Sequence, residues 1–339
     1  MMQDKSVNPR MRNMVKGLRA ATVMMFVGAC ATGGSAGSGW KLGDADDVDW
    51  AAASKPWWLK TQPCPDGGEL RGAAPPEGDE IWCSGTRGVR NGPWSQWYSS
   101  GQLKRSGAYR EGLEHGRFLR WYATGHKWGV VHYNSGRKHG DWRRWYENGK
   151  PWGEGAYREG LAHGRWVGWY ENGQKWSETE YEDGKENGAW IDWYYNGQIA
   201  KKGEFDDGER QGQWTLWHEN GQKREVGFYK DGKRHGRWQS WFEDGKPESD
   251  GSYKDGNKDG LWISWHDTGN KRSEGEYDEG LRIGPWKTWF ENGRKASEGN
   301  YVQGRQDGRW THWEENGAVV SVEEYEAGRL IEVLDVSQP

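Results

Sequence analysis

Residues 236–259 read GRWQSWFEDGKPESDGSYKDGNKD, and this segment decides the fold because its pattern recurs every 24 residues without an insertion. Its first glycine returns at positions 92, 116, 140, 164, 188, 212, 236, 260, 284 and 308, and a tryptophan follows five residues later each time. A fixed period of this length is the signature of a repeat array, in which each repeat packs mainly on its neighbours. Ten such repeats cover residues 92–331.

Each repeat carries two turn signals between aromatic segments. The first is Asn-Gly or Asp-Gly, as in Asn148-Gly149, and the second is a glycine three residues after a Tyr or Phe, as in Gly160. Asn-Gly and Asp-Gly predict type I′ hairpin turns, in which both central residues have positive φ. Three glycines per repeat and the absence of a 3.6-residue apolar stripe exclude a helix. The sequence predicts an all-β, elongated array of β-hairpins, an antiparallel meander of about twenty short strands, each of about six residues.

The expected register follows from pairing about the first turn. This pairing places Trp238 opposite Gly251, and an aromatic ring over a cross-strand glycine stabilises a weak strand site. The same register places Trp145 opposite Trp152. Leu, Ile and Val are scarce and the mean hydropathy is −1.15, so that aromatic ladders are expected in place of an aliphatic core.

The tryptophans five residues after each first glycine are the candidate binding residues. A long row of exposed rings on a protein surface normally marks a partner site, here a protein or a glycan that stacks on the rings. The alternative is that these rings form the core. The residues of the row are Trp97, Trp121, Trp145, Trp169, Trp193, Trp217, Trp241, Trp265, Trp289 and Trp313.

Two segments resemble a known repeat family. Tyr157-Arg-Glu-Gly-Leu-Ala-His-Gly-Arg-Trp166 resembles a MORN repeat, and Trp-Tyr-Glu-Asn-Gly-Gln-Lys (169–175) resembles the bacterial MORN variant of YwqK-type antitoxin-like proteins. The resemblance extends over all ten repeats, although tryptophan stands here at strand positions where Tyr or Phe is commoner. It implies an elongated stack of β-hairpins that serves as a scaffold, a dimerisation surface or a lipid-binding surface.

The N-terminal segment has the layout of a bacterial lipoprotein signal. Lys16 and Arg19 precede an apolar run that ends at Val27-Gly28-Ala29-Cys30, which resembles a lipobox. The sequence therefore predicts a signal peptide (1–29) that begins at Met1 or Met14, and then a lipidated Cys30 with a flexible linker (30–59). The alternative is an ordinary signal peptide with an unrelated cysteine. A lipid anchor places the protein in the bacterial cell envelope, at the outer membrane, on its periplasmic or surface face.

Two further cysteines are expected to close a disulfide. Cys64 and Cys83 form an even pair in an exported chain, and they bracket a turn-rich segment that lacks the 24-residue period. Residues 60–91 are therefore predicted to form an N-terminal cap that shields the first edge of the array. Residues 332–339 form a C-terminal tail.

No residue pattern points to catalysis, a metal or a cofactor. Histidines such as His139 and His163 recur one repeat apart, about 10 Å by strand spacing, which is too far for the ligands of one metal ion. The turn carboxylates recur at the same interval, and no nucleophile motif or phosphate loop is present. Lys and Arg number 47 against 51 acidic residues, interleaved along every repeat, which argues against a nucleic-acid partner. Neither an enzyme nor a small-molecule substrate is expected.

Two functions remain open from the sequence. The first is a non-catalytic, membrane-anchored repeat scaffold that binds another envelope protein or a wall polymer. The alternative is an antitoxin or immunity-like protein that neutralises a toxin by direct binding, as the resemblance implies.

Overall fold

The computed structural model describes residues 56–334. The predicted signal peptide (1–29), Cys30 and most of the linker (30–59) lie outside the described residues, as do residues 335–339. All ten repeats lie within the described range.

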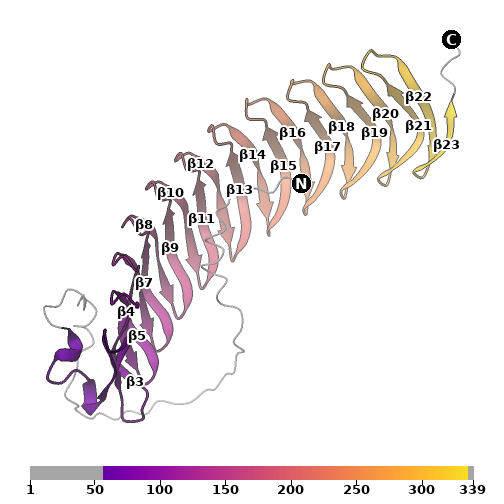
Figure 1. Cartoon of the computed structure of the whole chain (residues 1–339). Coiled ribbons are helices and arrows are strands. Elements are labelled where there is room, and N and C mark those ends of the chain that lie inside the picture. Colours follow the sequence, from indigo (N-terminus) through magenta and orange to yellow (C-terminus); the bar gives the residue numbers. More distant parts are fainter. Residues whose placement is uncertain (1–55, 335–339) are drawn as a thin grey trace, which may run out of the picture. The chain divides into compact units, whose positions relative to one another are not determined.

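The described residues are almost entirely β. They form 23 strands and two short 3₁₀-helices, in two compact units. Within the described range, the first unit contains residues 56–175 with 180–185, and the second contains residues 176–179 with 186–334. The prediction of an antiparallel β-hairpin array is confirmed, since each strand within a unit pairs antiparallel with the next (Figure 1). The repeat strands have eight or nine residues rather than the expected six or so.

The first unit contains the helices and the first nine strands, and β10 (Lys175–Glu182) has residues of both units. Its elements are η3 (Trp57–Leu59), η4 (Pro65–Gly67), β1 (Glu69–Ala73), β2 (Glu80–Ser84), β3 (Arg90–Trp97), β4 (Leu103–Arg110), β5 (Leu113–Trp121), β6 (Lys127–Asn134), β7 (Arg137–Trp145), β8 (Pro151–Arg158) and β9 (Leu161–Trp169).

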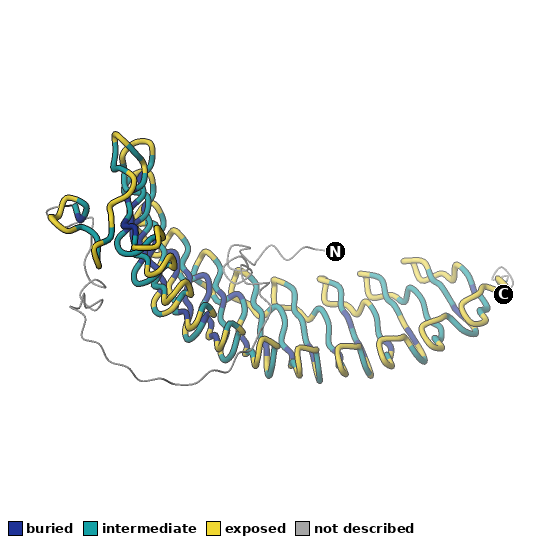
Figure 2. The backbone as a smooth tube through the Cα atoms, turned by 90° about the horizontal axis from the view of Figure 1, so that it is seen from below, coloured by how far each residue is buried: buried dark blue, intermediate teal, exposed yellow. Residues whose placement is uncertain are grey.

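The second unit contains the remaining strands. They are β11 (Lys185–Trp193), β12 (Ile199–Asp206), β13 (Glu209–Trp217), β14 (Lys223–Lys230), β15 (Lys233–Trp241), β16 (Pro247–Lys254), β17 (Asn257–Trp265), β18 (Lys271–Asp278), β19 (Leu281–Trp289), β20 (Lys295–Val302), β21 (Arg305–Trp313), β22 (Val319–Glu326) and β23 (Arg329–Leu334). Buried residues lie in the middle of the strands, and the turns at both ends are exposed (Figure 2).

The two turns of a repeat differ in type. In the second turn both central residues have positive φ, as at Asp255 (50°) and Gly256 (93°), which confirms a type I′ turn there. In the first turn only the glycine has positive φ, as at Gly149 (82°), whose N–H donates to the carbonyl of Tyr146. The prediction of a type I′ turn at Asn148-Gly149 is therefore wrong. A longer loop that ends in a left-handed glycine replaces it, because the strand that follows contains a bulge.

The glycine register is confirmed, but the ring that covers the glycine comes from the next repeat. Trp238 pairs with Gly251, as expected, whereas the ring that lies on the free face of Gly251 is that of Trp262. A Cβ at Gly251 would stand 2.2 Å from that ring. The same arrangement recurs at Gly155 with Trp166, Gly203 with Trp214, Gly227 with Trp238, Gly275 with Trp286, and Gly299 with Trp310.

In the second unit, each of these indoles also donates its N–H to a carbonyl of the strand beneath it. Trp238 Nε1 donates to the carbonyl of Phe228 at 3.1 Å, and Trp262 Nε1 donates to that of Ser252 at 2.9 Å. The acceptor is in each case the residue after the covered glycine. The missing Cβ therefore admits the ring and also brings the indole N–H within reach of the backbone, so that the buried polar atom has a partner.

The aromatic rings form the ladder that the sparse aliphatic content requires. Along the second unit, tryptophan and tyrosine alternate edge-to-face, with centroids 5.0 to 6.3 Å apart from Tyr229 to Trp310. Such pairs stabilise by about 0.5–1.5 kcal/mol each beyond the area they bury. Trp214 and Trp238 are 1% and 2% exposed, so this row is the core.

A bulge overturns the predicted pairing of Trp145 with Trp152. Arg144 pairs with Gly153 and Trp145 pairs with Pro151, so that Trp152 is the extra residue of the bulge. The same bulge recurs in the hairpins closed by the first turn of a repeat. In one example, Ser240 pairs with Ser249 and Trp241 pairs with Pro247. A bulge adds one residue to one strand, so the extra residue is aimed differently from its neighbours.

The N-terminal cap contains the expected disulfide. Cys64 and Cys83 are joined, with their Cα atoms 5.3 Å apart, and Cys83 is 1% exposed. Around it, Trp57, Ile81 and Trp97 form a buried cluster at the edge of the first repeat. The link closes a short loop in the unfolded chain, which stabilises the cap by about 3 kcal/mol in the entropic account.

We expect Gly251→Ala to destabilise the protein by about 1–3 kcal/mol, because the new methyl group overlaps the ring of Trp262 and forces it off the strand. Urea unfolding followed by tryptophan fluorescence measures the change. The neighbouring Ser252→Ala is the matched control and should change stability by less than about 0.5 kcal/mol. Equal effects of the two substitutions would contradict the proposed role of the glycine.

Candidate functional site

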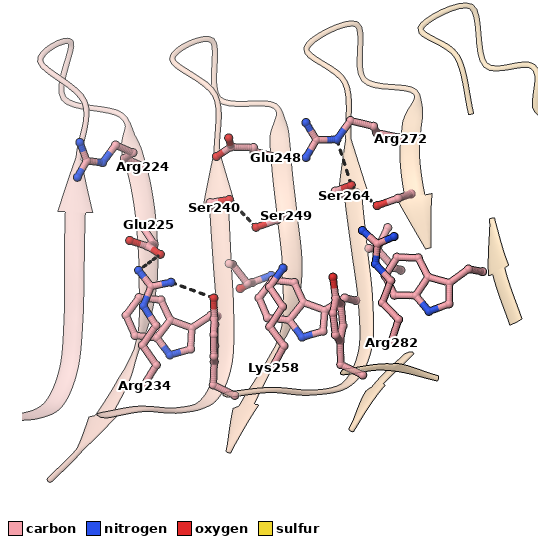
Figure 3. A pocket seen from close by; sticks show the side chains of 18 residues that line it. Arg224, Glu225, Arg234, Ser240, Glu248, Ser249, Lys258, Ser264, Arg272 and Arg282 are labelled. Atoms are coloured by element: carbon pink, nitrogen blue, oxygen red, sulfur yellow. Dashed lines mark hydrogen bonds and ion pairs between the residues drawn. The ribbon is translucent and has the colours of Figure 1, made fainter. Parts of the chain in front are cut away.

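A groove of about 490 Å³ lies in the second unit, on the face of β14–β19 that carries the Trp–Tyr ladder (Figure 3). Its floor is formed by the rings of Trp238, Trp262 and Trp286. Above these rings stand five basic side chains and two carboxylates, so that the lining has a net positive charge on a chain of net charge −4. The charged residues are Arg224, Arg234, Lys258, Arg272 and Arg282, with Glu225 and Glu248.

A row of cations covers the ring faces. Arg234 Cζ is 4.1 Å from the ring centroid of Trp238, and Lys258 Nζ is 3.9 Å from that of Trp262. Arg282 lies 4.6 Å from the Trp286 centroid. These residues stand at the same position of three successive repeats. The contacts are of cation–π type, and they leave the indole faces covered.

Only the first cation of this row has a carboxylate partner. Arg234 Nη2 is 2.8 Å from Glu225 Oε1, and Arg234 also donates to the hydroxyl of Tyr253 at 3.1 Å. Burial raises the pKa of the Glu225 carboxyl above its ordinary value, although Arg234 acts against this change. One and two repeats further on, the position of Glu225 is taken by Ser249 and Ser273. Lys258 and Arg282 therefore have a serine at the position where Arg234 has a carboxylate partner.

Among residues 56–334, no carboxylate forms an ion pair with Lys258 or Arg282. Burial is the largest cause that lowers the pKa of Lys258, and three like-charged guanidiniums lower it further. These guanidiniums belong to Arg282, Arg272 and Arg234. Lys258 lies over the rings of Trp262 and Tyr277, and the charged groups that act on its pKa are all cations, so an anion bound beside it would be stabilised.

Hydroxyl groups line the groove beside these cations. Ser240 and Ser249 are hydrogen-bonded at 2.7 Å between their Oγ atoms, and Ser264 and Ser273 at 2.6 Å. Arg272 Nε donates to Ser264 Oγ at 3.4 Å. Each hydroxyl keeps a lone pair or a proton for a further hydrogen bond, so the wall adds neutral donors to the cationic row.

The groove exists because the repeats differ at positions outside the ladder. In the first unit, the positions that correspond to Arg224 and Glu248 hold Trp128 and Trp152, and their rings lie on either side of Arg144, each 4.5 Å from its Cζ. The position of Arg144 corresponds to that of Ser240 in the second unit. Replacing an arginine between two indoles by serine opens the space that the groove occupies.

The structure does not place the predicted Trp row on an open surface. Trp97 and Trp121 are buried, at 7% and 6% exposure, and the other members described in the second unit are partly buried, as is Trp241. Lys271 and Lys295 lie over two of these rings, at 5.7 and 5.2 Å from their centroids. The row is therefore not a continuous strip of fully exposed rings. The repeat pattern does not reveal the groove residues, because they stand at positions where successive repeats differ.

The described residues contain no group of three or more His, Cys, Asp or Glu side chains that could hold a metal ion. In the same range, no helix has the length and apolar character needed to cross a membrane.

The MORN repeat variant model matches eight segments of 22 residues, which together cover just over half of the chain. The chain belongs to the MORN repeat variant family. The matches are 90–111, 138–159, 162–183, 186–207, 210–231, 234–255, 258–279 and 282–303. The two repeats without a match contain the same pairs of strands, β5 with β6 and β21 with β22. They carry Val131 and Glu323 at the position of the ladder glycine, which the matched repeat 162–183 also lacks, since Thr179 stands there.

The solved structures that match are large toxin complexes of low similarity. The TcdB2-TccC3 crystal structure is 10% identical, and the match covers 72% of this chain and 15% of that chain, with a TM-score of 0.17. The Tc holotoxin pore of Photorhabdus luminescens is 11% identical, with 73% and 14% covered and a TM-score of 0.17. Scores this low carry no argument about function. The chain has no significant match among curated proteins.

The two tryptophan rows should differ in their effect on stability. We expect Trp238→Ala to cost about 3–5 kcal/mol, because it removes a buried ring with a satisfied indole N–H. Trp241→Ala should cost less, because that ring is only partly buried. Urea unfolding of both variants measures the difference. A larger cost at Trp241 would contradict the assignment of the core to the Trp238 row.

Proposed function

We propose that this protein is a non-catalytic repeat scaffold that binds a partner through the groove of β14–β19. The observation that carries the proposal is the concentration of basic side chains there, five against two carboxylates, on a chain whose overall charge is negative. Charge complementarity of this kind steers association and fixes register. The repeats supply the rigid strands that hold the groove in place.

The scaffold acts in the bacterial cell envelope, held by a lipid on Cys30. The support for the anchor is the basic and apolar segment that ends at Val27-Gly28-Ala29-Cys30. The Cys64–Cys83 disulfide agrees with an exported protein, because disulfides persist in oxidising compartments. Stable anchoring takes more than one acyl chain. The linker between Cys30 and the cap would let the repeats reach a partner away from the bilayer.

The partner of the scaffold is another envelope protein or a wall polymer. The rings of the groove floor are covered by cations, and this favours a partner that offers negative charge over one that offers only sugar rings for stacking. A toxin neutralised by direct binding, as the family resemblance implies, is the alternative partner. Under this alternative, the toxin would bind in the same groove. Identifying the protein captured from membranes distinguishes a toxin from another envelope protein.

The anchor is tested by Cys30→Ser. Intact mass of the wild-type protein from membranes should show a chain that begins at Cys30 and carries acyl groups. The variant should lose the acyl mass and leave the membrane fraction, or remain unprocessed. A wild-type protein with a free, unmodified N-terminus beyond residue 30 would exclude lipidation.

The binding function is tested by capture from native membranes with the full, lipidated protein. We expect Lys258→Ala combined with Arg282→Ala to lose the partner, because these two cations, one partly buried and one exposed, account for much of the charge that the partner meets. Lys230→Ala with Lys254→Ala removes the same charge from the exposed ends of β14 and β16 and is the matched control. Partner recovery that is equal for both variants would show that the groove is not the binding surface.

A further inference from the structure

We infer that the groove binds an extended acidic segment of a partner protein, whose carboxylates take at Lys258 and Arg282 the place that Glu225 takes at Arg234. This inference rests on the proposed binding function and names the chemistry of the ligand. The structure itself contains the template, a carboxylate 2.8 Å from the guanidinium of Arg234 in the same groove as Lys258 and Arg282. In the described part of the chain these two cations have no carboxylate partner, although Arg282 donates to the hydroxyl of Tyr301 at 3.0 Å.

The repeat geometry explains why a ligand carboxylate could lie beside Lys258 or Arg282 as Glu225 lies beside Arg234. Glu225 pairs in the ladder with Ser240, and Ser249 with Ser264, one repeat later. The backbone around Lys258 is therefore equivalent to that around Arg234. The cation changes from arginine to lysine, and the side chain opposite it changes from the carboxylate of Glu225 to the hydroxyl of Ser249. The space and the charge for a carboxylate remain, together with the hydroxyls of Ser249 and Ser264 as donors.

The spacing of the sites sets the form of the ligand. Two strands per repeat separate Lys258 from Arg282 by about 9.6 Å at the usual strand spacing. A polyproline II chain returns to the same side every third residue, after about 9.3 Å. An extended segment that runs across the strands, with an acidic residue at every third position, therefore presents one carboxylate to each cation.

A flat anionic surface fits the groove less well than a single chain. Lys258 is partly buried above the Trp262 ring, and the bulged residues Arg224, Glu248 and Arg272 line the wall beside it. Glu248 would repel a continuous sheet of negative charge, whereas discrete carboxylates one repeat apart can avoid it. An acidic polysaccharide also lacks a stacking platform, because cations cover the ring faces.

The probe for the test is a synthetic peptide of repeated Glu-Pro-Pro triplets, titrated into the full-length protein at low salt. The peptide should bind, and raising the salt concentration should weaken it. A Gln-Pro-Pro peptide should not bind. A peptide of Glu-Pro-Pro-Pro repeats with the same number of carboxylates should bind more weakly, because its spacing no longer follows the repeats.

Substitutions that add or remove a carboxylate beside the groove cations make the test specific. Ser249→Glu with Ser273→Glu supplies the missing carboxylates from within and should weaken peptide binding at least about tenfold. Ser297→Glu is the matched control, because Gln306 replaces the cation in that repeat, and it should change affinity by less than about twofold. Glu225→Gln frees Arg234 and should strengthen binding. Far-UV circular dichroism confirms that each variant is folded.

Several results would overturn the inference. These are the absence of peptide binding to the wild type, equal binding by the Ser249→Glu/Ser273→Glu variant, and groove-dependent binding of anionic phospholipid vesicles or polygalacturonate in place of the peptide. Capture of a partner that depends on Lys258 and Arg282, together with failure of the peptide, would leave the binding function standing and would reject only the acidic-segment ligand.

Discussion

The contact of a tryptophan ring with a cross-strand glycine is the constraint on which the rest of this structure depends. Without a Cβ at Gly251, the indole of Trp262 lies directly on the neighbouring strand and donates its N–H to the backbone. Repetition of the contact builds an aromatic core from rings that are each almost fully buried, although the chain is poor in aliphatic residues. Close packing makes this position intolerant of change.

The same constraint leaves other positions free to acquire function. The ladder fixes the glycine, the tryptophan and the tyrosine in most repeats, while the positions on either side of it contribute little to the core. In the first unit these positions hold Trp128, Arg144 and Trp152, which fill the surface with stacked rings. In the second unit serines and arginines replace them, and a cationic groove results. The cost is an unpaired, partly buried Lys258, and natural proteins commonly accept such costs at functional sites.

Much of the fold follows from the sequence because the 24-residue period repeats the same local physics ten times. The strands, the type I′ turn at Asp255-Gly256 and the pairing of Trp238 with Gly251 were all predictable. The bulge before Trp145 was not, since an extra residue leaves no mark in a periodic pattern. The groove was missed for the opposite reason: a consensus averages away the change from glutamate to serine at 225, 249 and 273.

A crystal structure of the full-length protein with the Glu-Pro-Pro peptide tests most directly the claim that departures from the repeat create the binding site. The account predicts a peptide that crosses the strands above Trp262 and Trp286. Its carboxylates should lie within hydrogen-bond distance of Lys258 Nζ and of the Arg282 guanidinium, placed as Glu225 is placed on Arg234. A peptide bound on the opposite face, along the row of Trp241, with the groove empty, would contradict it.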